Sequence, residues 1–218
     1  MTVAIDSPAA AGAGTQAKYI AKEYNLLYLD TGKLYRFVGK IRLDKKKKFN
    51  YNYVRTKVNN LILKDLNHKS LLSDEVAQAA SKIAKDKKIR NIVKKFQKNC
   101  AYNPPLNFSG SILDGRDITS VIMKNAMFKF YITASLNVRA QRRFQEFKKL
   151  GKKISLNQVR KSLRNRDNLD KKRSLSPLKK TKDSILINTT KLSKKACFYK
   201  IKAIIDKKLK INGNLQRS

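Results

Sequence analysis

Small residues with two glycines and a threonine gather near the start of the chain, with the spacing of a loop that binds phosphate. Residues 2–15 read TVAIDSPAAAGAGT. The β-branched apolar run Thr2–Asp6 predicts a strand, residues 7–14 predict a loop, and the helical spacing of apolar residues after Thr15 predicts a helix. In such a unit the loop amides and the helix N-terminus converge on an anion. The stretch therefore predicts a phosphate-binding loop.

The loop departs from the usual pattern G-x-x-x-x-G-K-[ST] at two positions. Gly12, Gly14 and Thr15 are present, but Ser7 stands at the first glycine position and Ala13 at the lysine position. The stretch thus has the amides of a phosphate loop and lacks its ammonium group. Taken alone it also fits an ordinary Gly/Ala-rich turn of an α/β protein, so its function depends on the rest of the chain.

Polar residues follow the short apolar segments of the chain. Strands are predicted over Thr2–Asp6, Leu26–Leu29, Ser111–Gly115, Phe128–Thr133 and Ser184–Asn188. Helical segments separate them, which indicates an α/β fold with a parallel sheet covered on both faces. Ligands of such sheets bind beyond the carboxyl ends of the strands. The residues expected at that edge are Asp6 and Ser7, Asp30 and Thr31, residues 114–117, and Thr133.

Apolar residues with helical period predict the helices between these strands. Helices are expected after Thr15, from Lys33 onwards, over Val54–Leu66, Ser73–Lys85 and Ile89–Ala101, from the N-cap Ser135 to Gly151, and over Leu156–Arg166 and Ser193–Leu209. The three between the second and third strands form a helical insertion. The run Lys45–Lys48 predicts a solvated loop, and residues 212–218 predict a frayed tail.

Charge is the most unusual bulk property of the chain. Its 218 residues include 51 Lys and Arg against 15 Asp and Glu, a formal net charge of +36, which favours anionic partners. The excess is mostly lysine spread along the whole chain, which indicates a general compositional bias rather than a patch. Because there is no basic stripe interleaved with aromatic residues, we expect no dedicated nucleic-acid or membrane partner.

The cysteines, the histidine and the hydropathy exclude several further classes. Cys100 and Cys197 are far apart and lack a CxxC pair or a nearby histidine, so they predict neither a metal site nor a disulfide framework. They suit a reducing compartment. His68, the single histidine, lies in a polar segment and is expected at the surface. With no apolar run of membrane-spanning length and no signal-peptide pattern, we expect a cytoplasmic protein.

Six ordered motifs make the chain resemble the bacterial cytidylate kinase family of P-loop nucleoside-monophosphate kinases over nearly its whole length. IDSPAAAGAGT corresponds to the family's IDGP-x-[SA]-[SG]-GKGT, LDTGKLYR (Leu29–Arg36) to LD-[ST]-G-x-x-YR, and VAQAASKIA (Val76–Ala84), followed by Ile89-Arg90, to VxxxASxxA. DGRDIT (Asp114–Thr119) matches DGRDIGT with Thr119 in place of a glycine, TASLNVRAQRR (Thr133–Arg143) matches TAS-x-x-x-RA-x-RR, and RDNLDKKRSLSPL (Arg166–Leu178) matches RDxxDxxRxxxPL.

The resemblance implies a three-layer P-loop NTPase fold, with a five-stranded parallel sheet flanked by helices, in a single domain over 1–218. The implied parts are a core (1–44, 103–150 and 178–210), a helical acceptor-binding insertion (about 45–102) and a lid (about 151–177). The implied activity is ATP-dependent phosphorylation of CMP and dCMP to CDP and dCDP, by direct phosphoryl transfer with Mg²⁺. We expect a monomer whose partners are these small nucleotides.

The resemblance also implies roles for residues inside the matched motifs. The phosphate loop for ATP comprises Ala9, Ala10, Ala11, Gly12, Ala13, Gly14 and Thr15, with the Thr15 hydroxyl on Mg²⁺ and Arg143 as a donor contact. Arg142 is either a second donor contact or lid surface. The residues implied around CMP are Thr31, Arg36, Ser81, Arg90, Arg116, Asp117 and Asp170, and Arg166 and Arg173 act from the lid as catalytic residues. Guanidinium groups suit this work because they pair with phosphate in bidentate fashion.

The missing loop lysine requires another cation if the enzyme is active. Lys18 lies past the first helical turn and would point away from the loop. Lys33 follows Asp30-Thr31-Gly32 at the mouth of the second strand, where its ammonium group can reach the space between donor and acceptor phosphates. We therefore predict that Lys33 is the catalytic stand-in. Asp30 is expected to cap the following helix, with a water-mediated contact to Mg²⁺ as the alternative.

Other functions remain open at this point. The chain could be a non-catalytic relative that binds nucleotide or RNA and lost turnover with its lysine, but the retained acceptor residues, such as Arg36, Asp117 and Arg173, argue against decay. It could also be a UMP/CMP kinase of the same fold. A nucleic-acid-binding protein without enzyme activity is the least favoured interpretation.

Overall fold

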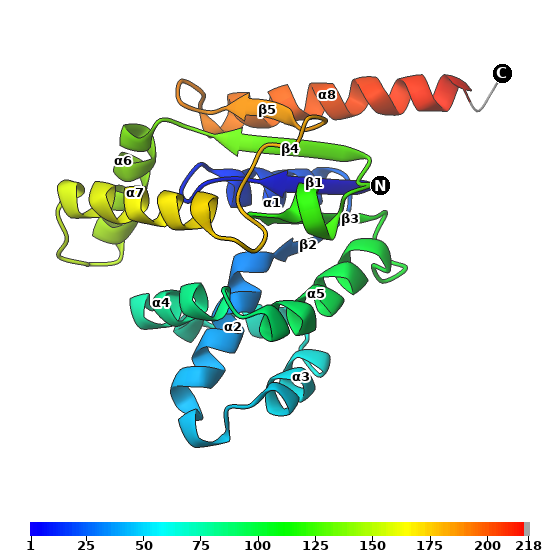
Figure 1. The fold of residues 1–218 in the computed structure, drawn as a ribbon. Coiled ribbons are helices and arrows are strands. Elements are labelled where there is room, and N and C mark those ends of the chain that lie inside the picture. Colours follow the sequence, from blue (N-terminus) through cyan, green and yellow to red (C-terminus); the bar gives the residue numbers. More distant parts are fainter. Residues whose placement is uncertain (216–218) are drawn as a thin grey trace.

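One parallel sheet of five strands forms the centre of the molecule (Figure 1). The computed structural model describes residues 1–215, except for the side chains of Lys46, Asp74 and residues 211–215. The strands are β1 (Thr2–Asp6), β2 (Leu27–Asp30), β3 (Ser111–Gly115), β4 (Phe128–Thr133) and β5 (Ile185–Asn188), in the order β2-β3-β1-β4-β5. Every pairing in this sheet is parallel, which confirms the predicted α/β fold.

Helices connect the strands and cover the sheet. The α-helices are α1 (Ala13–Glu23), α2 (Thr31–Asp44), α3 (Tyr51–Asn59), α4 (Asp74–Ile83), α5 (Lys87–Tyr102), α6 (Leu136–Lys149), α7 (Leu156–Lys172) and α8 (Lys194–Leu215). Short 3₁₀ turns occupy η1 (Lys46–Lys48), η2 (Leu63–Asn67) and η3 (Lys69–Leu72), and a π-helical turn, η4 (Ile118–Ile122), follows β3. Over residues 1–215, none of the helices combines the length and the apolar character needed to cross a bilayer.

Helices α2 and α3 differ from their predicted bounds. α2 begins at Thr31 rather than Lys33, because the Asp30 side chain accepts a hydrogen bond of 3.2 Å from the Lys33 amide and caps the helix earlier. The prediction of one helix over Val54–Leu66 was wrong for its second half, because α3 ends at Asn59. Asn59 and Asn60 form weak helical turns because their side chains compete for backbone hydrogen bonds.

Two later helices are longer than predicted. α7 continues past Arg166 to Lys172, because no glycine or proline interrupts this charged stretch, so the segment predicted as the lid is largely helical. α8 continues to Leu215, into the stretch expected to fray. The remainder of that predicted tail, residues 216–218, lies outside the described residues.

The side chains of β1 alternate between two hydrophobic clusters on opposite faces of the sheet. Val3 and Ile5 pack in a cluster with residues of α1 and α8, whereas Ala4 packs in the cluster that includes α2, α3 and α5. Helices therefore cover both faces, as Figure 1 shows. The strand is buried on both sides, which explains its continuous apolar sequence.

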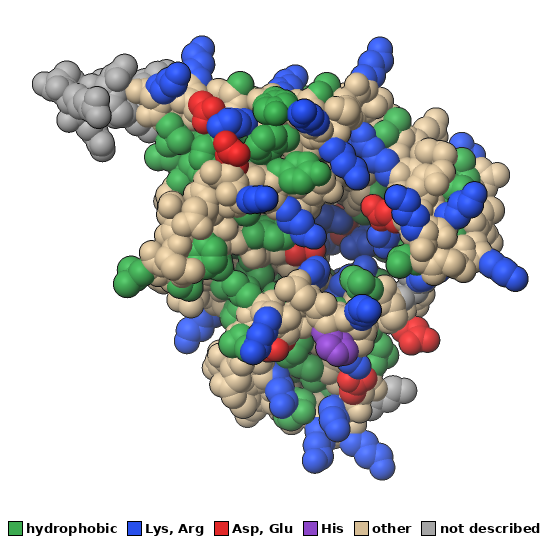
Figure 2. Space-filling model, turned by 180° about the vertical axis from the view of Figure 1, so that it is seen from behind, with side chains coloured by type: hydrophobic (Ala, Val, Ile, Leu, Met, Phe, Trp, Pro, Cys, Tyr) green, Lys and Arg blue, Asp and Glu red, His purple; other side chains and the backbone are tan. Residues whose placement is uncertain are grey.

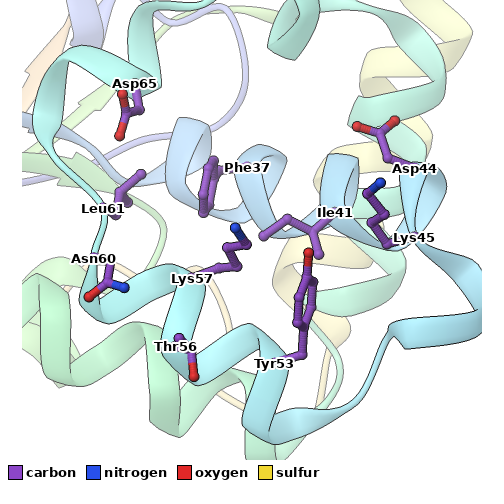
Figure 3. Close-up of a pocket in the computed structure, with 10 residues that line it drawn as sticks. All are labelled: Phe37, Ile41, Asp44, Lys45, Tyr53, Thr56, Lys57, Asn60, Leu61 and Asp65. Atoms are coloured by element: carbon purple, nitrogen blue, oxygen red, sulfur yellow. The ribbon is translucent and has the colours of Figure 1, made fainter.

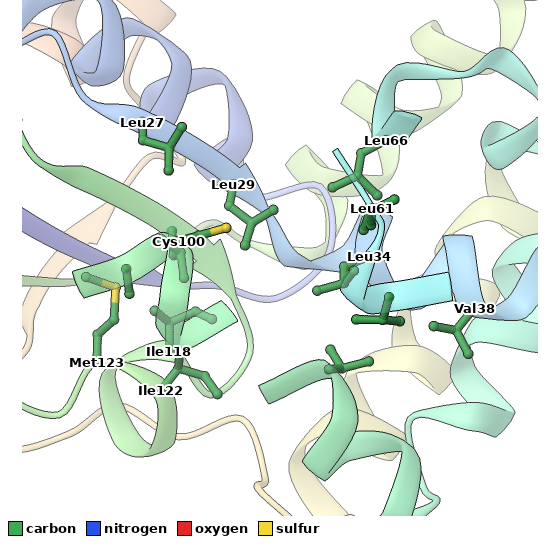
Figure 4. Close-up of a cluster of buried hydrophobic side chains, with 14 of the residues drawn as sticks. Leu27, Leu29, Leu34, Val38, Leu61, Leu66, Cys100, Ile118, Ile122 and Met123 are labelled. Carbon is green, nitrogen blue, oxygen red and sulfur yellow. The ribbon is translucent and has the colours of Figure 1, made fainter. Parts of the chain in front are cut away.

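A buried cluster joins the insertion to the sheet. It runs from Leu29 on β2 through Leu34 and Val38 on α2 to Leu61 and Leu66 in the insertion (Figure 4). Because these side chains are almost completely buried, the N-terminal half of α2 is held against both parts. The predicted acceptor residues of α2, Thr31 and Arg36, are thus placed by core packing.

Gly39 sets the close approach of α2 and α4. A Cβ atom at this position would lie 2.8 Å from the Ala80 amide nitrogen and 3.1 Å from the Val76 carbonyl oxygen. Only glycine allows two helix backbones to come this near. The small residues of the Val76–Ala84 motif therefore have a packing role on α2.

Helices α6 and α7 form a third, smaller cluster beside the loop after β1. Ala140 on α6 packs with Val159 and Leu163 on α7, and the phosphate-loop residues Ala9 and Ala10 pack against this cluster. Helices α6 and α7 therefore contact the N-terminal loop directly, and Figure 1 places them next to it.

Candidate active site

The loop between β1 and α1 has the backbone of an anion site. Gly12, the N-cap residue of α1, has a left-handed conformation (φ 92°) and leaves the first amides of the helix without a side-chain cap. Ala10 is also left-handed (φ 60°). Uncapped amides at a helix N-terminus attract a phosphate. Ala13, at the lysine position, is buried in the hydrophobic cluster under the loop.

Arg139 of α6, together with Thr189 after β5, holds two carbonyl groups of this loop. Arg139 Nη1 donates to the Ala9 carbonyl oxygen (3.1 Å), and Thr189 Oγ1 donates to the Ala11 carbonyl oxygen (3.0 Å). Arg142 donates to Thr189 twice, to its hydroxyl (2.9 Å) and its carbonyl (2.8 Å). Helix α6 therefore touches the loop through the charged group of Arg139.

Arg143, the donor contact implied by the resemblance, has partners on its own helix. Its guanidinium group pairs with Glu146 (2.8 Å) and lies 4.5 Å from the ring centroid of Phe147. Its predicted donor contact stays a prediction. Arg139 and Thr189 were missed by the sequence reasoning, although Arg139 is the first arginine of the matched RAxRR motif.

Two carboxylates lie at the ends of neighbouring strands beside α1. Asp30 and Asp114 are register partners on β2 and β3. A Cβ atom on Gly14 would lie 3.6 Å from Asp114 Oδ2, which places this carboxylate next to the first turn of α1. Burial, together with the nearby Asp30 carboxylate, raises the pKa of Asp114 far above its ordinary value. The Tyr28 hydroxyl donates to Asp114 (3.0 Å).

These oxygens have the chemistry of a magnesium site. Mg²⁺ is usually held by one or two carboxylates together with waters and substrate phosphates, and the Thr15 hydroxyl lies in the same helical turn as Gly14. Among the described residues, no group of three or more His, Cys, Asp or Glu side chains suited to a metal is present. Two carboxylates beside a hydroxyl fit a cation that is shared with a nucleotide. The interpretation of Asp30 as a helix cap is confirmed, and Asp114 was missing from the predicted site.

An ion-pair network joins residues that were predicted for the site and that come from three segments. Arg90 of α5 donates to Asp117, and both side chains are buried. Arg173, at the C-cap of α7, has Nη2 3.9 Å from the Asp117 carboxylate and Nη1 3.9 Å from that of Asp170. Arg116 donates to Asp170 (2.7 Å). The structure therefore brings these five predicted residues together.

Arg166 lies among other cations. Burial and the neighbouring Arg116, Arg36 and Arg143 lower its pKa to about 10, so it stays charged at neutral pH. The Arg173 guanidinium group has one nitrogen, Nη2, that is buried without a hydrogen-bond partner. A cluster of this kind is stabilised when an anion binds.

The other predicted acceptor residues differ in their surroundings. Arg36 of α2 donates to the Leu71 carbonyl oxygen (2.8 Å). The buried Thr31 hydroxyl donates to the Asp114 carbonyl oxygen (2.8 Å). Ser81 is exposed on α4, so its predicted contact with CMP stays a prediction.

Lys33 extends toward the insertion. Its ammonium group donates a hydrogen bond of 2.8 Å to Asn67 Oδ1 in η2. Lys33 lies in the first turn of α2, three residues after Asp30, and its backbone amide donates to the Asp30 carboxylate (3.2 Å). This partner is a neutral amide, which carries no negative charge of its own.

Hollows lie on two sides of the insertion. Figure 2 shows a hollow ringed mainly by Lys and Arg side chains. A cavity of about 680 Å³ separates the end of α4 from α7 and is lined by Lys85, Leu169 and Arg173, among others. Another, of about 400 Å³, lies between α2 and α3, where Phe37 and Tyr53 line it (Figure 3); none of the predicted site residues lines it.

Comparisons with known proteins agree with this geometry. The family model described as cytidylate kinase matches residues 3–207. A cytidylate kinase of Bartonella henselae is 40% identical over 210 residues, 94% of each chain, and one of Agrobacterium fabrum is 39% identical over 210 residues, 96% of this chain and 98% of that one. A solved structure of an uncharacterized protein from Eubacterium ventriosum has a TM-score of 0.55 at 14% identity, covering 94% of this chain and 97% of that one, and shows the fold alone.

Proposed function

The chain belongs to the cytidylate kinase family, and we propose that it transfers the γ-phosphoryl group of ATP, with Mg²⁺, to CMP and dCMP. It is a nucleoside-monophosphate kinase that phosphorylates CMP, as the family indicates. The identity of the donor, the cation and the roles of single residues are the proposal. So are the division into core, insertion (about 45–102) and lid (about 151–177), the monomeric state and the cytoplasmic location.

The observation that carries the proposal is the network Arg90–Asp117–Arg173–Asp170–Arg116. It joins the insertion, the end of β3 and the lid helix at the carboxyl edge of the sheet. Asp117 and Asp170 present carboxylates for a base and a sugar, while Arg90 and Arg173 supply cations for a phosphate. A non-catalytic relative would have no need to keep this set intact.

Phosphoryl transfer mainly requires the chain to position two phosphates and to neutralise their charge. The amides of residues 9–15 bind the donor phosphates, and Arg36, Arg90 and Arg173 orient the acceptor phosphate. Its oxygen attacks the γ-phosphorus while the bond to the β-phosphate oxygen breaks, which gives ADP and CDP. Closure of α7 excludes water from the reacting group.

The cation and the lysine position complete the proposal. Thr15 and Asp114 would hold Mg²⁺, which would supply further neutralisation of the donor phosphates. Lys33 takes over the charge that Ala13 lacks, as its position beside Asp30 supports. In turnover its ammonium group leaves Asn67 for the phosphates.

Turnover with each monophosphate in turn tests the proposed function. With ATP and Mg²⁺ in a coupled assay, CMP and dCMP should be the best acceptors. AMP and GMP should fail by orders of magnitude, because a site with buried hydrogen-bonding groups rejects ligands that leave them unpaired. UMP turnover at the CMP rate would favour the UMP/CMP kinase alternative, and turnover of AMP or GMP at that rate would overturn the assignment. A wild type that binds nucleotide without turnover would favour the non-catalytic relative.

A further inference from the structure

Arg139 connects the phosphate loop with the lid helix through a buried ion pair. Its guanidinium group forms two hydrogen bonds with the Asp167 carboxylate, Nη1 to Oδ1 (3.1 Å) and Nη2 to Oδ2 (2.6 Å). Nη1 also donates to the Ala9 carbonyl oxygen, and Nε donates to the Ala134 carbonyl oxygen (3.0 Å). Arg139 is 5% exposed and Asp167 9%. The arginine thus has a fixed geometry and touches three segments at once.

The contact with Ala9 determines where a loop amide points. The carbonyl and amide groups of a planar trans peptide point in opposite directions. Because Arg139 holds the Ala9 carbonyl, the following amide, that of Ala10, is turned away from α6. Thr189 acts on the Ala11 carbonyl in the same way and so orients the amide of Gly12. Both amides belong to the loop that binds the donor phosphates.

Asp167 stands among the acceptor residues of α7. Arg166 is its neighbour in sequence, and Asp170 lies one helical turn further on. The Arg116–Asp170 pair and the approach of Arg173 to Asp117 fix the same helix on the acceptor side. Any movement of α7 on acceptor binding is therefore passed to Arg139, and through it to Ala9.

We propose that Arg139 and Asp167 are positioning residues that couple the acceptor site to the donor phosphate loop. The inference rests on the proposed function. The docked α7 holds Arg139 in place, Arg139 orients the loop amides toward the donor, and donor and acceptor therefore bind cooperatively. In a loop without its lysine, these oriented amides carry a larger share of donor binding.

Direct binding measurements test the coupling without requiring turnover. The affinity for a non-hydrolysable ATP analogue with Mg²⁺ is measured by calorimetry with and without saturating CMP, for the wild type and for Asp167→Asn. We expect the wild type to bind the analogue about tenfold more tightly when CMP is present. In Asp167→Asn the ratio should fall to nearly one, with a raised KM for ATP. Asp183→Asn, which removes the exposed partner of Lys129 far from the site, is the matched control and should keep the ratio.

A double variant separates positioning from stability. Asp167→Asn leaves a buried charge unpaired, which destabilises the fold, whereas Arg139→Met with Asp167→Leu removes both charges and restores apolar packing. We expect the double variant to regain the wild-type melting temperature and still lack the coupling. Recovery of the coupling together with stability, or a wild type that shows no coupling, would overturn the proposal. A coupled wild type without turnover would instead contradict the proposed function alone.

Discussion

The Thr119 hydroxyl donates a hydrogen bond of 2.5 Å to Asp6 Oδ2, which ties the start of the π-helical turn η4 to the end of β1. The backbone amides of Ile118 (2.7 Å) and Thr119 (2.9 Å) donate to the same carboxylate. Arg116 and Asp117 lie directly before this turn. The threonine that replaces the family's usual glycine thus adds a bond to the anchor of the acceptor residues.

We expect Asp6 to make stability depend on pH. Burial raises its pKa from 3.8 to about 6, against the hydrogen bonds that lower it. Because the pKa is higher in the folded state, the protonated carboxyl group stabilises the fold. This contribution is complete below the unfolded-state pKa and is lost as the pH rises through about 6. Between pH 4 and 7 the wild type should therefore lose about 2 kcal/mol of unfolding free energy relative to Asp6→Asn. Denaturant titrations at a series of pH values measure this difference.

Asp183 offers a control of opposite sign. Hydrogen bonds from Lys129 and Thr181 lower the pKa of its exposed carboxyl. Its contribution is present above the ordinary pKa and is lost as the pH falls. The unfolding free energy of the wild type relative to Asp183→Asn should therefore not fall between pH 4 and 7. A flat difference for Asp6→Asn over the same range would contradict the burial argument.

The sheet and its ligand edge were predictable because strand signals are local. The runs Thr2–Asp6, Ser111–Gly115 and Phe128–Thr133 are apolar and short, and the observed bounds of these three match the prediction. Their parallel arrangement follows from the helices between them. The positions of Asp6 and Asp30 at strand ends were read directly from the same pattern.

Contacts between distant segments were not predictable in this way. Nothing in the spacing of Arg139 and Asp167, or of Thr189 and Ala11, indicates that they meet, since the packing of α6 on α7 decides it. Lys33 illustrates the same limit. Its place in the sequence beside Asp30 is visible, but its hydrogen bond to Asn67 depends on how η2 folds back over α2.

The close contact of α2 and α4 predicts a sensitive position at Gly39. In an exposed helix Gly→Ala stabilises by about 1 kcal/mol, but here the new methyl group would meet backbone atoms of Ala80 and Val76. The helices must separate, and overpacking of this kind costs about 1–3 kcal/mol. We expect Gly39→Ala to lower the unfolding free energy and to raise the KM for CMP, because α4 and Arg36 shift together. An unchanged KM with increased stability would show that α4 adapts freely.

Arg173 should affect turnover more than acceptor binding. The buried Nη2 atom has no hydrogen-bond partner, and burial lowers the pKa of the guanidinium group. Both are expected of a group that binds an anion. If it stabilises charge that develops during transfer, Arg173→Ala should lower kcat by about 10²–10³ and change the Kd for CMP far less. Lys171→Ala removes the same charge from an exposed site on α7 and should have little effect. Equal losses in kcat and affinity would mean that Arg173 binds only the ground state.

Variants of Lys33 and Ala13 test the proposed stand-in for the missing lysine. An ammonium group beside the donor phosphates stabilises charge in the transition state, so Lys33→Ala should lower kcat by about 10²–10³. Lys18→Ala, on the exposed face of α1, removes the same charge and should be nearly neutral. Coupled assays with ATP, Mg²⁺ and CMP measure each rate.

Two further variants decide whether Lys33 acts on the phosphates or only through Asn67. Asn67→Ala removes the partner seen at 2.8 Å and leaves the ammonium group free to move, so its kcat should stay close to that of the wild type. Ala13→Lys in the Lys33→Ala background returns a charge to the loop and should restore part of the rate, because the two positions serve the same phosphates. A purely structural Lys33 would give Asn67→Ala the same defect as Lys33→Ala and would leave the double variant unrescued. Full activity of Lys33→Ala would end the hypothesis and turn attention to Arg142, whose guanidinium nitrogen would lie 3.9 Å from a Cβ atom on Gly12.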